Sequence, residues 1–174
     1  MNLLHDVDPG TKSEMNVVIE IPKDSHNKYE IDKETGLIKL DRANYSAAAY
    51  PFDYGFVPQT LWDDGDALDV IVLTTYPLAV GVLATVRPIA ILNMIDNGEP
   101  DEKVLAVPAE DKRWEDVREL DDLNKHTLKE IVHFFETYKV LKGKPSPVEI
   151  NGWSGRVEAE VAFERARKMY ADKK

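Results

Sequence analysis

The chain contains no cysteine among its 174 residues. It therefore forms no disulfide and offers no thiolate nucleophile or ligand, and its composition is compatible with a reducing compartment. It also lacks an apolar run of about 18 residues, which a membrane helix requires. The first residues, MNLLHDVDPG, lack the basic start and long apolar core of a signal peptide. We therefore expect a cytoplasmic protein with no membrane partner.

Basic residues are in the minority, with 22 Lys and Arg against 32 Asp and Glu and a net charge of −10. Such a surface repels nucleic acid and anionic membranes unless a basic patch is segregated, so we expect no nucleic-acid partner. A site for an anion must be built locally, by cations gathered against the overall field. The length and the 43% apolar content predict one domain spanning residues 1–174, large enough for a substantial core.

The most informative stretch is WDDGDALDVIVLT, residues 62–74, in which four aspartates surround Gly65 before an apolar run that predicts a buried strand. In a straight strand Asp64 and Asp66 would share a face and Asp69 would lie on the other. They converge only if the chain bends, which costs least at Gly65. Converging carboxylates favour a hard divalent cation, Mg²⁺ or Mn²⁺. An acidic surface turn before a core strand explains this stretch alone equally well.

Apolar periodicity predicts many short strands followed by two helices. A period of two, or a continuous apolar run, predicts strands at residues 15–21, 28–32, 37–40, 70–73, 80–95, 103–107 and 148–150. The strand at residues 80–95 is expected to bend near Pro88. Residues 47–58 are expected to form an irregular extended segment, and residues 96–101 a loop. A period near 3.6 predicts one helix that includes residues 128–135 and ends near Gly143, and a second over residues 157–170. The order predicts an α+β fold, with a small closed five-stranded OB-like β-barrel, additional strands and two main C-terminal helices packed outside.

Charged and phenolic side chains recur outside the acidic stretch, at Glu20, Lys28, Glu30, Arg42, Asp96, Asp101, Lys103, Tyr138 and Lys139. Each by itself is most simply a solvated strand face or a helix end. Together they supply carboxylates for several divalent ions and cationic donors for a polyanion. This combination suits a phosphate ester or anhydride that arrives with its metals.

The order and spacing of these motifs closely resemble the soluble family I inorganic pyrophosphatases of prokaryotic type. The family's Asp-Gly-Asp-Pro-x-Asp core corresponds to residues 64–69, and the blocks VVIEIP, KYEID, LDR, YPFDYGFVPQT, TTYPL, IDNGEPDEK and FFETYK extend the resemblance over nearly the whole chain. Ala67 stands where the family usually has proline. Proline would stiffen this turn without donating a ligand, so we expect the same reaction with a different local rigidity.

The resemblance implies hydrolysis of inorganic diphosphate to two orthophosphates, by attack of a water activated by Mg²⁺, with Mn²⁺ or Zn²⁺ as possible substitutes. It implies that Asp64, Asp69 and Asp101 hold one activating metal and that Asp69 also touches a second. The attacking water would bridge these ions, and Asp66 would take its proton. Further Mg²⁺ that arrives with the pyrophosphate would bind at Asp96, with Asp101, and at Glu30.

For the substrate, the resemblance implies that its oxygens are held by Lys28, Arg42, Lys103, Tyr138 and Lys139. Tyr54 would line the pocket, and Glu20 and Tyr50 would support it. The resemblance also implies a homo-oligomer, most simply a hexamer.

Three other functions would use some of the same residues. A cation-binding module of the EF-hand type requires glycine at the sixth loop position, where a loop starting at Asp64 has Asp69. A phosphatase that forms an aspartyl-phosphate would use an aspartate as the nucleophile and would be detected by trapping that intermediate. A barrel binding single-stranded nucleic acid would use Tyr50, Phe52 and Tyr54, but the net charge opposes it.

Overall fold

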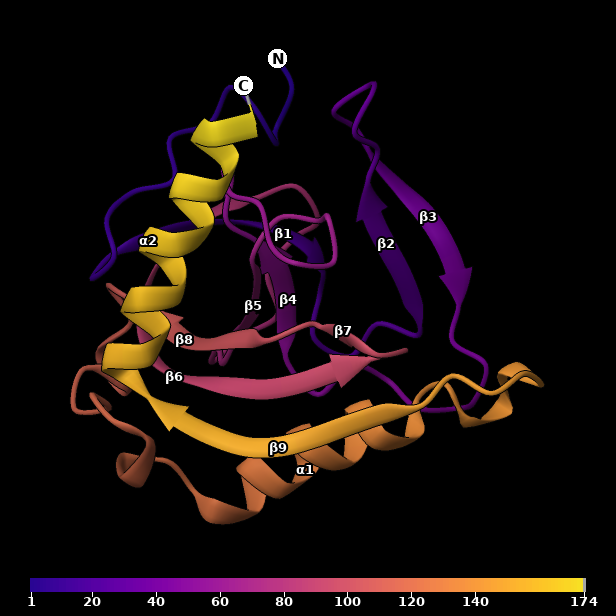
Figure 1. Cartoon of the computed structure of the whole chain (residues 1–174). Coiled ribbons are helices and arrows are strands. Elements are labelled where there is room, and N and C mark those ends of the chain that lie inside the picture. Colours follow the sequence, from indigo (N-terminus) through magenta and orange to yellow (C-terminus); the bar gives the residue numbers. More distant parts are fainter. Residues whose placement is uncertain (174) are drawn as a thin grey trace.

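Five strands close into a ring in the computed structural model, which describes residues 1–173 (Figure 1). In the order of the ring they are β1 (Met15–Ile21), β4 (Asp53–Phe56), β5 (Asp69–Val72), β8 (Lys103–Pro108) and β6 (Leu83–Asp96). The ring closes because β6 pairs with β1 as well as with β8. Only the β5–β8 pair of the ring is parallel. This is the small barrel that the sequence predicts.

The remaining elements lie outside the ring. β9 (Val148–Gly155) and the two-residue β7 (Glu99–Pro100) both pair with β6. β2 (Asn27–Ile31) and β3 (Ile38–Ala43) form a separate hairpin, which stands beside the barrel in Figure 1. Helix α1 (Lys125–Thr137) lies beneath β9, and α2 (Arg156–Lys173) runs along one side of the barrel. The two helices outside the barrel are thus confirmed.

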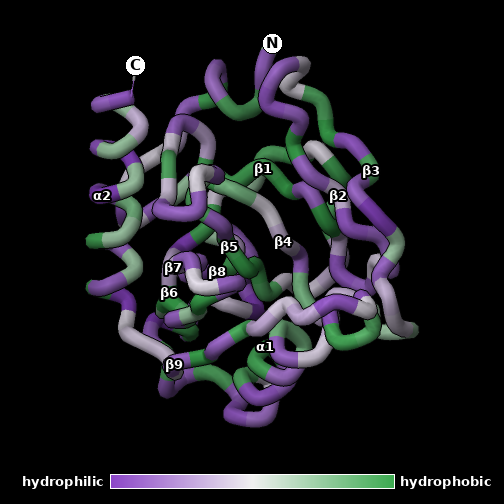
Figure 2. The backbone as a smooth tube through the Cα atoms, turned by 45° about the vertical axis from the view of Figure 1, so that its right-hand side comes forward, coloured by the Kyte–Doolittle hydropathy of each residue, from purple (hydrophilic) through white to green (hydrophobic). Residues whose placement is uncertain are grey.

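The strands of the ring are apolar on both faces, as the continuous apolar run of β5 predicts. Ile71 belongs to a core cluster that includes the buried aromatic residues of α1, whereas Val70 and Val72 belong to a second cluster with α2. In Figure 2 the hydrophobic colour accordingly concentrates along the inner strands. Alternate residues of one strand therefore anchor different helices, which fixes the barrel between them.

Strand β4 lies inside the segment that we expected to be irregular, so that expectation is wrong for residues 53–56. The aromatic and proline-rich composition of residues 47–58 is not typical of a strand. Strand β4 forms because it pairs with β5 on one side and approaches β1 closely on the other. A Cβ on Gly55 would lie 2.0 Å from the carbonyl oxygen of Val18, so only glycine fits at this position.

Most other boundaries agree with the periodicity, with three differences. The expected loop at residues 96–101 contains β7, and β9 extends five residues past Ile150. Helix α1 ends at Thr137 rather than near Gly143, and a 3-10 turn at residues 140–142 leads to that glycine, whose φ is +81°. Strand β6 runs through Pro88 with an irregular register there, as the expected bend requires.

Candidate active site

The parallel pairing of β5 and β8 places Asp69 beside Lys103 at the start of both strands. The side chain of Lys103 is buried, and its Nζ donates to Oδ2 of Asp69 at 2.7 Å and also to Oδ1 of Asp101. From the neighbouring strand β4, the hydroxyl of Tyr54 donates to Oδ2 of Asp69 at 2.6 Å. Strand register thus gathers two carboxylates, a lysine and a tyrosine from three segments of the chain.

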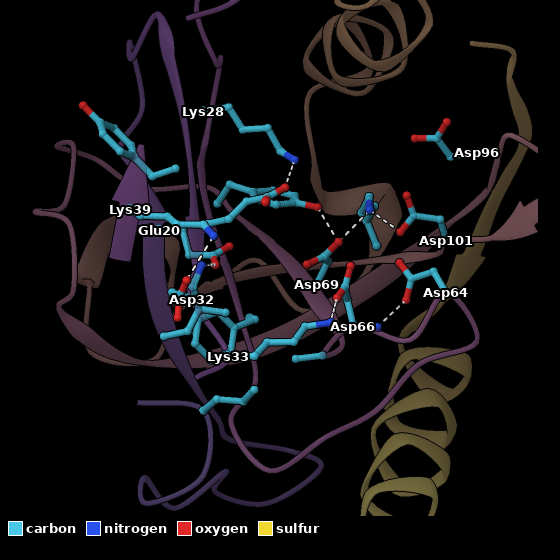
Figure 3. A pocket seen from close by; sticks show the side chains of 18 of the residues that line it. Glu20, Lys28, Asp32, Lys33, Lys39, Asp64, Asp66, Asp69, Asp96 and Asp101 are labelled. Carbon is cyan, nitrogen blue, oxygen red and sulfur yellow. Dashed lines mark hydrogen bonds and ion pairs between the residues drawn. The ribbon is translucent and has the colours of Figure 1, made fainter. Parts of the chain in front are cut away.

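The acidic turn before β5 bends where the sequence predicts. Gly65 has a φ of +85°, and the backbone N–H of Trp62 donates to the carbonyl of Asp66 at 2.7 Å, which closes the turn. Within it, Oδ1 of Asp64 accepts from the N–H of Asp66 at 3.0 Å. Figure 3 shows Asp64, Asp66, Asp69 and Asp101 grouped around one space. The bend at Gly65 therefore lets these carboxylates face one space.

This space is a cavity of about 590 Å³ between the barrel rim and the β2–β3 hairpin. Twelve of the predicted site residues line it: Glu20, Lys28, Glu30, Tyr54, Asp64, Asp66, Asp69, Asp96, Asp101, Lys103, Tyr138 and Lys139. Within it, Lys28 pairs with Glu30, and Lys139 pairs with Asp96. Segments of the chain from Leu4 to Lys139 therefore meet in one cavity that holds both signs of charge.

Arg42 and Tyr50, the other two predicted residues, are not among the residues that line the cavity in the described chain. Arg42 is paired across the hairpin with Lys28, and its Nη1 donates to Asp41 at 2.8 Å. Tyr50 is buried behind the cavity, with its ring 6.3 Å from that of Tyr54 and 4.6 Å from that of Phe134. Tyr50 therefore packs behind the wall, as a supporting residue would.

The hairpin also supplies residues that the sequence reasoning missed. Lys33 and Lys39 line the cavity, and Lys33 forms an ion pair with Asp66 while donating to the carbonyl of Gly65 at 3.2 Å. Lys39 is paired with Asp32 at 3.0 Å. A lysine beside a hairpin turn has the sequence signature of an ordinary surface residue, so only the docking of the hairpin reveals these positions.

Burial and repulsion from neighbouring carboxylates raise the pKa values of three cavity carboxylates, Glu20, Asp64 and Asp101. Burial, aided by the charge of Asp69, raises the pKa of Glu20 to about 8. Burial also raises the pKa of Asp64, and that of Asp101 although Lys103 opposes the rise. Burial disfavours the charge of Lys103, but Asp69 and Asp101 outweigh it and raise the lysine pKa above its ordinary value. The cavity therefore holds more negative charge than its lysines offset, and added cations would stabilise it.

The donor set fits divalent cations, although the side chains are held together by Lys103. Within residues 1–173, no three acidic or histidine side chains are grouped closely enough to hold an ion as they stand. The ammonium of Lys103 lies between Asp69 and Asp101 and supplies the positive charge that an ion would supply there. Oδ1 of Asp96 is buried without a hydrogen-bond partner in the described chain. A donor set made of oxygen atoms alone suits Mg²⁺ or Mn²⁺. Because the lysine side chain is flexible, the Lys103 ammonium can move away from Asp69 and Asp101 when an ion binds between them.

A closed barrel whose rim carries clustered carboxylates, lysines and tyrosines has the chemistry that a metal-assisted hydrolase of phosphoric anhydrides requires. Comparison with known proteins agrees, because the family model described as inorganic pyrophosphatase matches residues 17–171. The chain belongs to the inorganic pyrophosphatase family. Enzymes of this family hydrolyse inorganic diphosphate to orthophosphate, and the family resemblance stated from the sequence is confirmed.

Individual relatives cover almost the whole chain. It is 48% identical to the inorganic pyrophosphatase of Geobacillus stearothermophilus over 156 residues, which are 90% of this chain and 93% of the relative. It is 49% identical to that of Methanosarcina acetivorans over 157 residues, 90% and 92% of the two chains. The crystal structure of the Thermus thermophilus inorganic pyrophosphatase has a TM-score of 0.94 at 42% identity and covers 98% of this chain and 99% of its own. The Helicobacter pylori structure has a TM-score of 0.91 at 41% identity, covering 95% and 99%.

Neither α1 nor α2, nor any shorter helix in residues 1–173, is long and apolar enough to cross a membrane.

Proposed function

We propose that this diphosphate-hydrolysing enzyme uses Mg²⁺ and splits inorganic diphosphate by direct attack of water, without a covalent enzyme intermediate. The observation that carries the proposal is the meeting of Asp69, Asp101 and Lys103 with the Asp64–Asp66 turn in one cavity. A bound divalent cation would supply a more acidic water and neutralise phosphoryl charge. Mn²⁺ and Zn²⁺ are proposed as substitutes.

The metal-binding roles are proposed for the carboxylates. Asp64, Asp69 and Asp101 would hold one ion, and Asp69 would also contact a second. Tyr54 donates to Asp69 and so directs that carboxylate toward the cavity. Asp96, whose Oδ1 is buried without a partner in the described residues, would with Asp101 hold an ion that arrives with the substrate, as would Glu30.

The reacting groups are proposed as follows. Asp66 lines the cavity with an exposed side chain, and there it would accept the proton of the attacking water. The basic and phenolic residues of the cavity would bind the diphosphate oxygens and stabilise the charge of the leaving phosphate. They are Lys28, Lys103, Tyr138 and Lys139, joined by Arg42 from the hairpin, with Tyr54 as part of the wall and with Glu20 and Tyr50 in support.

The test is orthophosphate release from diphosphate with Mg²⁺, without it and with a chelator. Asp66→Asn removes the proton acceptor while keeping the shape of the side chain, so we expect turnover to fall by about 10²–10⁴-fold with Mg²⁺ binding retained. Asp116→Asn, at an exposed aspartate that is not among the residues lining the cavity, is the matched control. Turnover of Asp66→Asn equal to that of the control would refute the role of Asp66. Release of orthophosphate in the chelator at the Mg²⁺ rate would refute metal dependence.

We also propose, from its length and composition, that the chain is a single domain spanning residues 1–174 of a cytoplasmic protein, and, from the family resemblance, that it forms a homohexamer. Sedimentation equilibrium of the purified protein measures the mass of the assembly, and a monomer of 19.7 kDa would contradict the hexamer.

A further inference from the structure

Two loops that carry predicted metal ligands are joined outside the cavity by a chain of contacts that we call the Trp62 brace, formed by Trp62, Asp63, Glu102 and Arg165. The indole Nε1 of Trp62 donates to Oε2 of Glu102 at 2.7 Å. Trp62 is buried, and its indole N–H is the only donor of that side chain. Because Trp62 precedes Asp64 by two residues and Glu102 follows Asp101, this bond cross-links the two ligand-bearing loops.

Helix α2 contacts three consecutive residues of the first loop, residues 61–63. The guanidinium of Arg165 lies 4.6 Å from the centre of the Trp62 ring, and its Nη2 donates to Oδ1 of Asp63 at 2.6 Å. The backbone N–H of Leu61 donates to the carbonyl of Ala166 at 3.0 Å. Since α2 is anchored to the barrel by its own buried face, the loop is tied to a rigid element (Figure 1).

The brace also provides partners for two carboxylates that lie outside the cavity. Asp63 and Glu102 are carboxylates next to proposed ligands, but neither is among the residues that line the cavity. Arg165 pairs with Asp63, and the indole N–H hydrogen-bonds Glu102, so both carboxylates have partners outside the cavity. Carboxylates placed close together before an ion arrives repel one another, and a rigid frame must oppose that repulsion.

We propose that Trp62, Glu102 and Arg165 are positioning residues for the metal site, which hold Asp64 and Asp101 where both can bind one cation. The proposal rests on the proposed function, because it requires Asp64 and Asp101 to be ligands. Groups that orient metal ligands without touching the metal typically change affinity by 10–100-fold when they are removed. The brace therefore sets the affinity for Mg²⁺, whereas the catalysed step at saturating Mg²⁺ depends on the cavity residues.

The experiment measures Mg²⁺ binding by isothermal titration calorimetry on the intact protein, beside the Mg²⁺ dependence of orthophosphate release. Trp62→Phe keeps a buried ring under Arg165 but removes the N–H donor. Glu102→Ala removes the acceptor, whereas Glu102→Gln keeps an acceptor oxygen. We expect Trp62→Phe, Glu102→Ala and Arg165→Gln each to weaken Mg²⁺ binding about tenfold, with turnover at saturating Mg²⁺ within about twofold of the parent. Glu102→Gln should bind Mg²⁺ nearly as well as the parent.

Arg167→Gln is the matched control, because it removes the same charge from the same helix at an arginine that lies 6.0 Å from the ring of Phe163 rather than on Trp62. We expect its Mg²⁺ affinity to equal that of the parent. The double variant Trp62→Phe/Glu102→Ala should bind no more weakly than either single variant, because both remove one bond. Parent affinity in folded Trp62→Phe and Glu102→Ala would overturn the positioning role alone. Absence of Mg²⁺ binding by the parent protein would overturn the metal site as well.

Discussion

Replacing Glu20 by glutamine removes an ionisable group from the wall of the cavity with little change in shape. Glu20 is on β1, is 6% exposed, and its Oε1 accepts from the backbone N–H of Ile31 at 2.6 Å. An amide oxygen can accept the same bond. Because burial and the nearby charge of Asp69 disfavour the carboxylate, the folded protein without metal binds a proton at Glu20 that the unfolded chain releases.

The size of the effect follows from proton linkage. The pKa of Glu20 is raised from 4.5 to about 8 in the folded state. The folded state therefore binds more protons than the unfolded state between these values, and its stability falls as the pH rises through that window. The full rise corresponds to about 5 kcal/mol, from about 1.4 kcal/mol for each pKa unit. Between pH 6 and pH 8 the loss from this one group is about 2 kcal/mol.

The assay is thermal unfolding of the parent and of Glu20→Gln at pH 6 and pH 8, in a chelator. Both proteins carry no charge at this position at pH 6, so we expect similar melting temperatures there. At pH 8 we expect Glu20→Gln to melt roughly 4–8 °C higher relative to the parent. Glu14→Gln, at an exposed glutamate just before the same strand, is the control and should follow the parent. Parallel pH dependences for the parent and Glu20→Gln would refute the reasoning.

Three further substitutions test the charges of the site and its frame. Lys103→Met leaves Asp69 and Asp101 without their buried counter-charge, so we expect the free energy of unfolding, measured with urea in a chelator, to fall by about 3–5 kcal/mol. Added Mg²⁺ should restore part of this loss. If Mg²⁺ restores none of it, a metal ion does not bind where the lysine ammonium lies. Lys33→Gln removes a competing positive charge beside Asp66, so we expect less Mg²⁺ to be needed for half-maximal activity and a stability change below about 1 kcal/mol; an unchanged Mg²⁺ titration would contradict this. Asp53→Asn keeps one oxygen to accept from the N–H groups of Lys23 and Leu78, but replaces the oxygen that accepts from the Thr74 hydroxyl by an NH2 group and removes the charge from all three bonds. It should lower the free energy of unfolding by about 1–3 kcal/mol, and an unchanged urea midpoint would show that the charge contributes nothing to those bonds.

Much of the fold was predictable because apolar periodicity reflects burial directly. The continuous run after Asp69 predicts a strand buried on both faces, and the period near 3.6 around Ile131 predicts α1. Strand β4 was not predictable, because it depends on the contact of Gly55 with β1 rather than on any pattern within its own four residues. The apolar pattern of a segment predicts a helix or strand when burial of its apolar side chains is enough to stabilise it. The pattern does not predict a strand that depends on one particular backbone contact, such as that of Gly55.

The cavity residues were identified mainly through the family resemblance, and their chemistry agrees with the composition of the acidic stretch. The same reasoning missed Lys33, because a lysine near a turn is usually a surface residue and only the docking of the hairpin brings it to Asp66. It also missed the Trp62 brace. Arg165 lies 103 positions from Trp62, and nothing in its own helix distinguishes it from the other charged residues there.

The amino-acid sequence by itself therefore determined the kind of chemistry: oxygen ligands without thiolates, an acidic turn with a bend at Gly65, and basic residues set against a net charge of −10. The tertiary structure decided which of these side chains meet. Asp69 lies beside Lys103 because β5 and β8 pair in parallel in one register, and Trp62 reaches Glu102 because α2 packs against the same loop. Register and packing depend on the whole barrel closing at once, so no single segment of sequence contains them.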